Sequence, residues 1–157
     1  MSVSPILAVD PGISGAVAFL YPVINRVSVY DTPVAGGEVD IPNLTTLIKN
    51  YAPGVAIIER VSALPGNGSV SMFNFGRCYG DVRGVIGALN IPVHFVTPQK
   101  WKKHFNLSKD KEQSRMLAIR LFPSVADRFA LKKHSDRAEA VLLALYGDQE
   151  ILKRSVA

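Results

Sequence analysis

The sequence predicts an α/β fold in which a central mixed five-stranded sheet is flanked by helices. Short apolar runs that suit strands occupy residues 5–10, 15–21, 26–31, 55–59 and 93–96. A tight turn separates the first two runs, whereas a segment with helical spacing precedes each of the last two. This order, with further helices at the end of the chain, indicates one mixed sheet with helices packed on it.

The first half of the chain is expected to form three strands and a helix. Residues 11–15 (PGISG) contain glycines that permit the positive φ of a tight turn, so the first two runs predict a hairpin. Residues 26–31 alternate apolar and polar side chains, which predicts a half-exposed third strand. We expect a loop rich in Pro and Gly over 32–40, then a helix that begins near Asp40 and ends by 53–54.

The second half alternates strands and helices. Residues 55–59 are apolar apart from the last and include β-branched residues, as in a strand buried on both faces. Residues 64–69 are glycine-rich and are expected to form a mobile loop beside this strand. Helical spacing over 72–89 leads to the strand at 93–96, after which we expect helices over about 98–105, about 110–121 and from about Ser135 onward.

Composition limits the classes to which the chain can belong. Its 157 residues, 48% of them apolar, suit one domain spanning 1–157. The one cysteine, Cys78, excludes an internal disulfide and is expected in the core of a protein from a reducing compartment. With no secretory signal pattern and no apolar stretch of ~18 residues, we expect a soluble intracellular protein with no membrane partner. The net charge of +5 favours an anionic partner.

Four acidic residues are placed as metal ligands would be. Asp10 and Glu59 end apolar runs, while Asp136 and Glu139 stand three residues apart in the first turn of the last helix, on one face. If the two strands are adjacent and in register, the carboxylates meet, and their repulsion requires a divalent cation. Carboxylate oxygens suit Mg²⁺, and two Mg²⁺ ions about 3.5–4 Å apart serve phosphodiester hydrolysis.

Each acidic residue alone also has a structural explanation. Asp10 precedes Pro-Gly and suits a turn, and Glu59 can pair with Arg60. Helix capping explains Asp136 or Glu139, taken singly, as well as ligation does. The combination of all four favours the metal site.

Nearly the whole chain resembles a known family of nucleases. It resembles the RuvC-type Holliday junction resolvases of the ribonuclease-H-like superfamily in residues 6–12 (ILAVDPG), 57–59 (IIE) and 136–140 (DRAEA). It is similar to the branch that contains the chloroplast resolvases and related phage and bacterial enzymes in residues 97–102 (TPQKWK), 121–123 (LFP) and 132–140 (KKHSDRAEA).

The resemblance implies a ribonuclease-H-like fold and a Mg²⁺-dependent endonuclease, with Mn²⁺ able to substitute. Such an enzyme resolves four-way DNA junctions by paired symmetric nicks, in the cytoplasm or nucleoid of a bacterium or phage-infected cell, or in an organelle. Two symmetric nicks require a homodimer, for which helix 72–89 and the basic segment 100–103 are candidate interfaces.

By resemblance the metal ligands are the four acidic residues, with Glu139 standing where the bacterial pattern has Asp. Lys111, within the basic segment 109–115, is expected to contact the scissile phosphate, although its acidic neighbours also suit a solvated helix face. His134 is either a metal ligand or general base, or a helix-start histidine bound to the backbone.

The residues expected to contact DNA follow the second acidic strand or lie in the basic helices. Those that would wedge between bases at the crossover are Met72, Phe73, Asn74 and Phe75, and core packing is an alternative for Phe75. Trp101 is expected to pack under the sheet edge, and any sequence preference to come from residues 64–75. The expected phosphate contacts are Arg77, Arg83, Lys100, Lys102, Lys103, Lys109 and Arg115.

Three other functions compete with junction resolution. A related nuclease acting on other branched DNA or on RNA–DNA hybrids would use the same metal site. An actin-like or sugar-kinase-like nucleotide-binding protein shares an Asp-x-Gly turn between its first strands, but it is usually larger and has a second phosphate-binding glycine turn. A non-catalytic nucleic-acid-binding module would not need Glu59 together with the Asp136/Glu139 pair.

Overall fold

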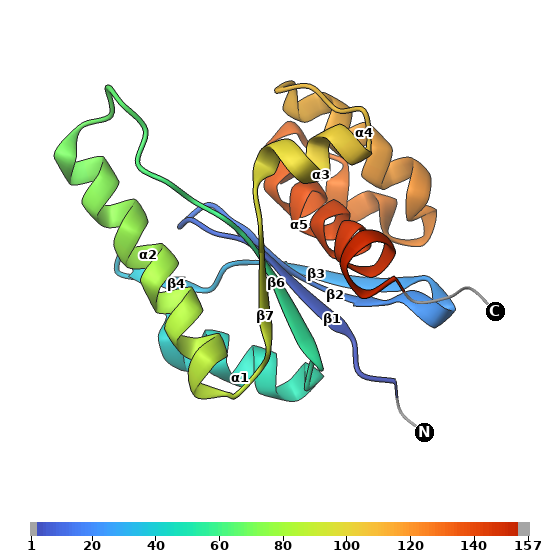
Figure 1. The fold of residues 1–157 in the computed structure, drawn as a ribbon, viewed down its shortest axis with the longest axis horizontal. Coiled ribbons are helices and arrows are strands. Elements are labelled where there is room, and N and C mark those ends of the chain that lie inside the picture. The colour runs from blue at the N-terminus through green and yellow to red at the C-terminus, as the bar shows by residue number, and fades with distance from the viewer. Residues whose placement is uncertain (1–2, 154–157) are drawn as a thin grey trace.

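Five strands form one mixed sheet at the centre of the molecule (Figure 1). The computed structural model describes residues 3–153, within which the strand order is β3-β2-β1-β6-β7. β1 pairs antiparallel with β2 and parallel with β6, so the predicted mixed sheet is confirmed. The strands are β1 (Ile6–Asp10), β2 (Ala16–Tyr21), β3 (Arg26–Asp31), β6 (Val55–Glu59) and β7 (Val93–Val96).

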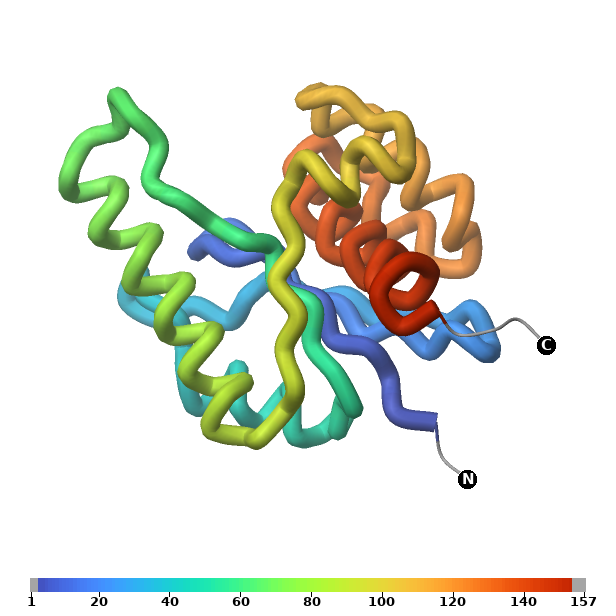
Figure 2. The backbone as a smooth tube through the Cα atoms, in the orientation of Figure 1, coloured from blue at the N-terminus to red at the C-terminus, as the bar shows by residue number. Residues whose placement is uncertain are grey.

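Helices cover both faces of this sheet. α1 and α2 lie on one face and α4 and α5 on the other, with α3 directly after β7, as the continuous trace in Figure 2 also shows. None of the helices within residues 3–153 is long and apolar enough to cross a membrane. The helices are α1 (Ile41–Tyr51), α2 (Ser69–Ala88), α3 (Pro98–His104), α4 (Lys111–Leu121) and α5 (Ser135–Tyr146), which a π-helical turn (Gly147–Leu152) continues.

The capping residue and the proline that predict the start of α1 have the expected roles in the structure. The Asp40 side chain accepts a hydrogen bond from the Asn43 amide at 3.1 Å, which satisfies a free N–H of the first turn. Pro42 lies in that turn, where its missing N–H has no intrahelical partner to lose. The helix ends at Tyr51 and is followed by the C-cap Ala52, whose φ of 47° is left-handed, so the predicted stop by residues 53–54 is confirmed.

Period-two alternation along the strands divides the core into two layers. In β1 the side chains of Leu7 and Val9 pack with α1 and α2, whereas Ile6 and Ala8 pack with α5. All four are fully buried, and most residues of α5 are buried. Cys78 on α2 is 3% exposed within the first layer, which confirms its predicted place in the core.

The register of β1 with β6 places two acidic residues side by side. Val9 pairs with Ile58, so Asp10 and Glu59 follow at the same level of neighbouring parallel strands. Both continue the alternation that turns Ala8 toward α5, and therefore both lie on the α5 face of the sheet. The adjacency and register on which the predicted metal site depends are confirmed.

The turn between β1 and β2 requires a glycine at one position. A Cβ atom on Gly15 would lie 2.0 Å from the Asp10 carbonyl oxygen, a distance that no side chain tolerates. The Gly15 amide instead donates to the Gly12 carbonyl at 3.0 Å and closes the turn. The predicted tight hairpin is confirmed, and its close backbone approach holds the end of β1 in place.

Two segments differ from the sequence prediction. The predicted loop over 32–40 contains a small hairpin of β4 (Val34–Ala35) and β5 (Glu38–Val39), because Gly36 and Gly37 both adopt positive φ and form a two-residue turn. α2 begins at Ser69 rather than near 72, since the extended Gly68 ends the preceding loop and its carbonyl accepts the Met72 amide at 3.1 Å. Residues 69–71, which precede the predicted helix, are therefore helical, so part of the segment 64–75 that is expected to give any sequence preference belongs to α2.

Candidate metal centre

Carboxylates from two elements meet where β1 ends beneath the start of α5. Asp10, Asp136 and Glu139 each offer an oxygen atom, and these oxygens all lie within 4.8 Å of one another. The Asp136 and Glu139 carboxylates share one face of the first turn of α5, and no side chain caps this helix start. Capping therefore does not explain the pair, which faces the end of β1 instead.

The electrostatics of this cluster suit a cation. Burial raises the pKa of Asp10 well above its ordinary value, and the negative charges of Glu59, Glu139 and Asp136 raise it further. Glu139 is 5% exposed, and within residues 3–153 its Oε1 accepts no hydrogen bond. A buried acceptor without a hydrogen bond, among carboxylates that repel, fits a hard divalent ion such as Mg²⁺ or Mn²⁺.

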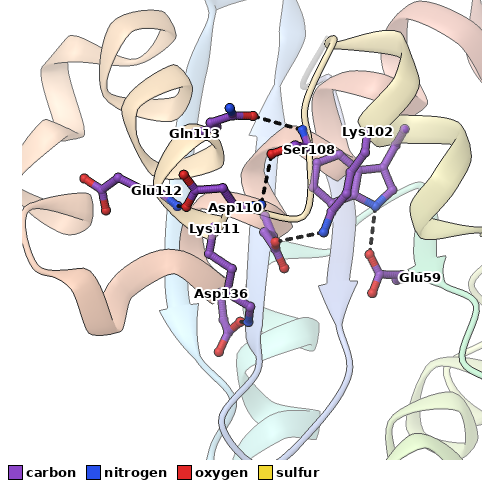
Figure 3. A network of polar contacts seen from close by, with 10 residues as sticks. Glu59, Lys102, Ser108, Asp110, Lys111, Glu112, Gln113 and Asp136 are labelled. Carbon is purple, nitrogen blue, oxygen red and sulfur yellow. Dashed lines mark hydrogen bonds and ion pairs between the residues drawn. The ribbon is translucent and has the colours of Figure 1, made fainter. Parts of the chain in front are cut away.

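Two lysines compensate part of this negative charge (Figure 3). The Lys111 ammonium lies 2.8 Å from Asp136 Oδ1, and the Lys102 ammonium forms an ion pair with Glu139 Oε1 at 3.3 Å, without hydrogen-bond geometry. Burial alone would lower the pKa of Lys111, but the hydrogen bond and the charge of Asp136, with Glu139, raise it. Lys111 thus lies at the acidic cluster rather than on a purely solvated face. Lys102 likewise lies toward the acidic cluster, and its contact with a DNA arm stays a prediction.

Glu59 is held at the edge of the cluster by a tryptophan. Its Oε2 accepts a hydrogen bond of 2.7 Å from Trp101 Nε1, and Trp101 is fully buried, as its predicted packing requires. Burial raises the pKa of Glu59, while the Trp101 hydrogen bond opposes that shift and the charge of Glu139 adds to it. The structure therefore gathers three of the four predicted carboxylates tightly and places Glu59 beside them.

Comparison with solved structures identifies the fold. RuvC of Thermus thermophilus in complex with a Holliday junction substrate superposes with a TM-score of 0.60 at 14% identity, covering 93% of this chain and 96% of that chain. A second structure of Thermus thermophilus RuvC gives 0.57 at 14% identity, covering 92% and 96%. The yeast mitochondrial Holliday junction resolvase gives 0.56 at 15% identity, covering 90% and 78%.

The chain has the RuvC fold. The predicted ribonuclease-H-like α/β architecture is confirmed, whereas the predicted chloroplast-type branch stays a prediction. No protein-family model and no curated protein matches the sequence. At 14–15% identity the likeness establishes this architecture, and the chemistry has to be argued from the side chains of the chain itself.

On this RuvC fold, His134 precedes α5 but is not part of the carboxylate cluster. Its Nδ1 accepts the Leu131 amide at 3.2 Å, which is the backbone-bound alternative anticipated for a histidine at a helix start. Burial lowers the pKa of His134, and the charges of Arg137 and Lys133 lower it further. The structure shows the backbone-bound arrangement, and a role of His134 as metal ligand or base stays a prediction.

The predicted wedge residues differ in exposure. Phe73 is 69% exposed in the first turns of α2, next to the exposed Val70, whereas Met72 and Asn74 are half-buried. Phe75 lies against the β1–β2 turn, since its Cε2 would be 3.6 Å from a Cβ at Gly12. The packing alternative therefore describes Phe75, and Phe73 is the apolar side chain that projects into solvent.

The predicted phosphate contacts divide into free and engaged side chains. Lys100, Lys103 and Lys109 are exposed on α3 and the loop that follows it. Arg115 is engaged: its guanidinium donates to the carbonyls of Phe129 and Ala130 at 2.8 and 2.9 Å, and it also pairs with Glu112. Arg115 therefore holds a loop in this structure, and its contact with DNA stays a prediction.

The two arginines of α2 are partly engaged. Arg77 pairs with Glu38 at 2.8 Å, with both side chains partly exposed. The Arg83 guanidinium lies 5.2 Å from the centre of the Phe95 ring, and Arg83 is exposed. Because surface ion pairs and exposed cation–π contacts each contribute about 1 kcal/mol or less, both arginines can still turn toward a phosphate.

Replacing Asp10 by Asn should stabilise the metal-free protein, and increasingly so as the pH rises. Because folding raises the pKa of Asp10, its carboxyl is neutral in both states well below the ordinary pKa of 3.8. Above that pH the unfolded chain loses this proton more readily than the folded chain, which favours unfolding. Urea unfolding in chelator should show an advantage of Asp10→Asn that is small near pH 4 and about 1–3 kcal/mol at pH 8.

The matched control is Asp127→Asn, because Asp127 is exposed and is not one of the clustered carboxylates. Its stability relative to the wild type should not change in this way with pH. An advantage of Asp10→Asn that stays the same from pH 4 to pH 8 would contradict the electrostatic argument.

Proposed function

We propose that this chain is a divalent-metal-dependent endonuclease that resolves four-way DNA junctions by paired symmetric nicks. The observation that carries the proposal is the meeting of Asp10, Asp136 and Glu139 on the RuvC fold, with buried Glu139 Oε1 accepting no hydrogen bond in the described part of the chain. One of the similar structures is a RuvC in complex with a Holliday junction substrate, which supports the same class of substrate here. Activity on a junction assembled from synthetic strands tests the proposal.

Asp10, Asp136 and Glu139 would hold the metal, with Glu59 completing the set. A pair of Mg²⁺ or Mn²⁺ ions held there would supply an activated water and stabilisation of the leaving oxygen of the scissile phosphate. Lys111 contributes a positive charge beside Asp136, and we infer that it contacts the scissile phosphate. Lys102 compensates part of the negative charge of Glu139 through their ion pair.

Two surfaces next to the cluster suit a branched polyanion. Lys100, Lys103 and Lys109 are exposed near the start and end of α3 and supply contacts to phosphates, which position DNA independently of sequence. Phe73 stands exposed at the start of α2 and can insert between bases where the junction is already unstacked. The net charge of +5 favours this association at low ionic strength.

A symmetric dimer would place two such centres on one junction, and α2 is the interface that the structure favours. Gly76, Gly80 and Gly84 recur at four-residue spacing on this helix, all of them exposed and with open space where a Cβ would lie. Residues four apart share one face of a helix, so these glycines permit close approach of a second helix. Two-fold symmetry would then pair α2 with its copy.

Asp10→Asn should abolish junction cleavage and preserve junction binding. The substitution removes a charged ligand oxygen from the cluster, so Mg²⁺-dependent nicking should fall by about 10³-fold or more while the basic surface is unaltered. Nicking is measured on a labelled synthetic four-way junction, and binding by gel shift at one salt concentration. Asp127→Asn is the control, and cleavage by Asp10→Asn at the wild-type rate would refute the metal site.

The same assay with other substrates separates this function from its nearest rival. A four-way junction, a flap and an RNA–DNA hybrid are compared at one salt concentration, because the electrostatic part of binding depends strongly on salt. Preference for the four-way junction supports resolution. Equal or faster cleavage of the flap or the hybrid would assign the chain to a different nuclease of this fold.

Phe73→Ala should weaken junction cleavage without destabilising the protein. Phe73 is 69% exposed, so its removal costs little packing, whereas a crossover without this aromatic wedge should be cleaved about 10-fold more slowly. The control is Val23→Ala, which removes a 74% exposed apolar side chain at the opposite end of β2. Equal effects of the two substitutions on cleavage would exclude the wedge.

Gly80→Leu should convert a dimer into a monomer. A branched side chain on the exposed glycine face would separate the paired α2 helices, while a glycine-to-leucine change at an exposed helical position favours the helix itself. Sedimentation equilibrium should give a dimer for the wild type and for the control Thr46→Leu on α1, and a monomer for Gly80→Leu. A wild type that stays monomeric even with junction DNA would refute the dimer.

A further inference from the structure

Trp101 has one hydrogen-bond donor, and the fold directs it at Glu59. The indole Nε1 lies 2.7 Å from Glu59 Oε2, and no part of the Trp101 side chain is exposed. A buried indole N–H without an acceptor is destabilising, so this position needs a partner. The partner is the carboxylate of Glu59, at the end of β6. An aromatic ring without an N–H would be enough to fill the core.

The backbone fixes the relation between these two residues. Val96 at the end of β7 pairs with Glu59, and the Arg60 amide donates to the Val96 carbonyl at 2.7 Å. α3 begins directly after β7, so Trp101, in the first turns of α3, returns over the end of β6. The sheet ladder therefore aims the indole at Glu59, and the contact does not depend on a flexible loop.

The next residue of α3, Lys102, also reaches the acidic cluster. Lys102 places its ammonium 3.3 Å from Glu139 Oε1 and 5.4 Å from the centre of the Trp101 ring. Two successive residues of one short helix thus reach two acidic residues from different elements. Figure 3 shows Glu59 and Lys102 together at this side of the site.

We propose that Trp101 is a positioning residue for the metal centre: its N–H holds Glu59 Oε2 in one orientation and leaves Oε1 free to ligate a divalent ion. The inference rests on the proposed function, because it takes Glu59 as a ligand. An outer hydrogen bond of this kind orients a ligand before the metal arrives, and its loss typically weakens metal binding 10–100-fold. The indole contributes through Glu59 and needs no contact with DNA.

The test measures Mn²⁺ binding to the full metal-free chain by calorimetry, with no DNA present. Trp101→Phe keeps an aromatic ring in the core and removes the N–H, and it should weaken Mn²⁺ affinity about 10–100-fold. In the Glu59→Gln background, where the ligand is already impaired, Trp101→Phe should cause no further loss. The matched control Phe122→Leu alters another buried aromatic side chain of the same core layer and should leave the affinity unchanged.

Three results overturn the inference in distinguishable ways. Wild-type affinity in a folded Trp101→Phe variant refutes the positioning role. A further loss on adding Trp101→Phe to Glu59→Gln shows that the ring acts through packing and not through Glu59. Unchanged affinity in Glu59→Gln alone shows that Glu59 is not a metal ligand. That result contradicts the part of the proposed function on which the inference rests.

A second measurement needs no change at Trp101. Trp101 is the one tryptophan in the sequence, so the intrinsic emission of the protein at tryptophan wavelengths reports on this position. Paramagnetic Mn²⁺ should quench this emission saturably in the wild type, and Glu59→Gln should shift the midpoint to about 10-fold or more higher Mn²⁺ concentration. An emission that is insensitive to saturating Mn²⁺ would overturn the proposal even if Trp101→Phe did not fold.

Discussion

The parallel pairing of β1 with β6 is the constraint on which the rest of the site depends. It sets Val9 opposite Ile58, and the next residues of both strands are therefore acidic at the same level. A register slip of one residue would turn one carboxylate into the other core layer. α5 packs on β1 and β2, so that its first turn brings Asp136 and Glu139 to Asp10 at the end of β1.

The acidic cluster works against the stability of the fold that contains it. Asp10 and Glu59 are buried among like charges, which raises the pKa of both. The compensation comes from side chains that each hold one carboxylate: Lys111 on Asp136, Lys102 on Glu139, and Trp101 on Glu59. The two apolar core layers, one on each face of the sheet, supply the stability that offsets this unfavourable burial of charge. Such a conflict between local stability and charge is typical of functional sites.

Local sequence signals predict the elements well and individual partners poorly. The strand bounds and the cap at Asp40 follow from period, turn glycines and capping chemistry, all of which act within a few residues. The predicted start of α2 is wrong by three residues because Gly68 stops the loop without a side-chain cap. Arg115 and Lys102 have the same charge and similar settings in sequence, yet one holds the carbonyls of a later loop and the other faces the acidic cluster.

The sequence by itself determined the α/β architecture and the four acidic positions, because periodicity and the placement of charge at element ends are properties of neighbouring residues. Only the tertiary structure decided which carboxylates meet and which side chains support them. Trp101 and Glu59 are 42 residues apart, and Lys111 and Asp136 are 25 apart. Contacts at such separations depend on strand register and on the direction in which a helix leaves the sheet, which no local pattern specifies.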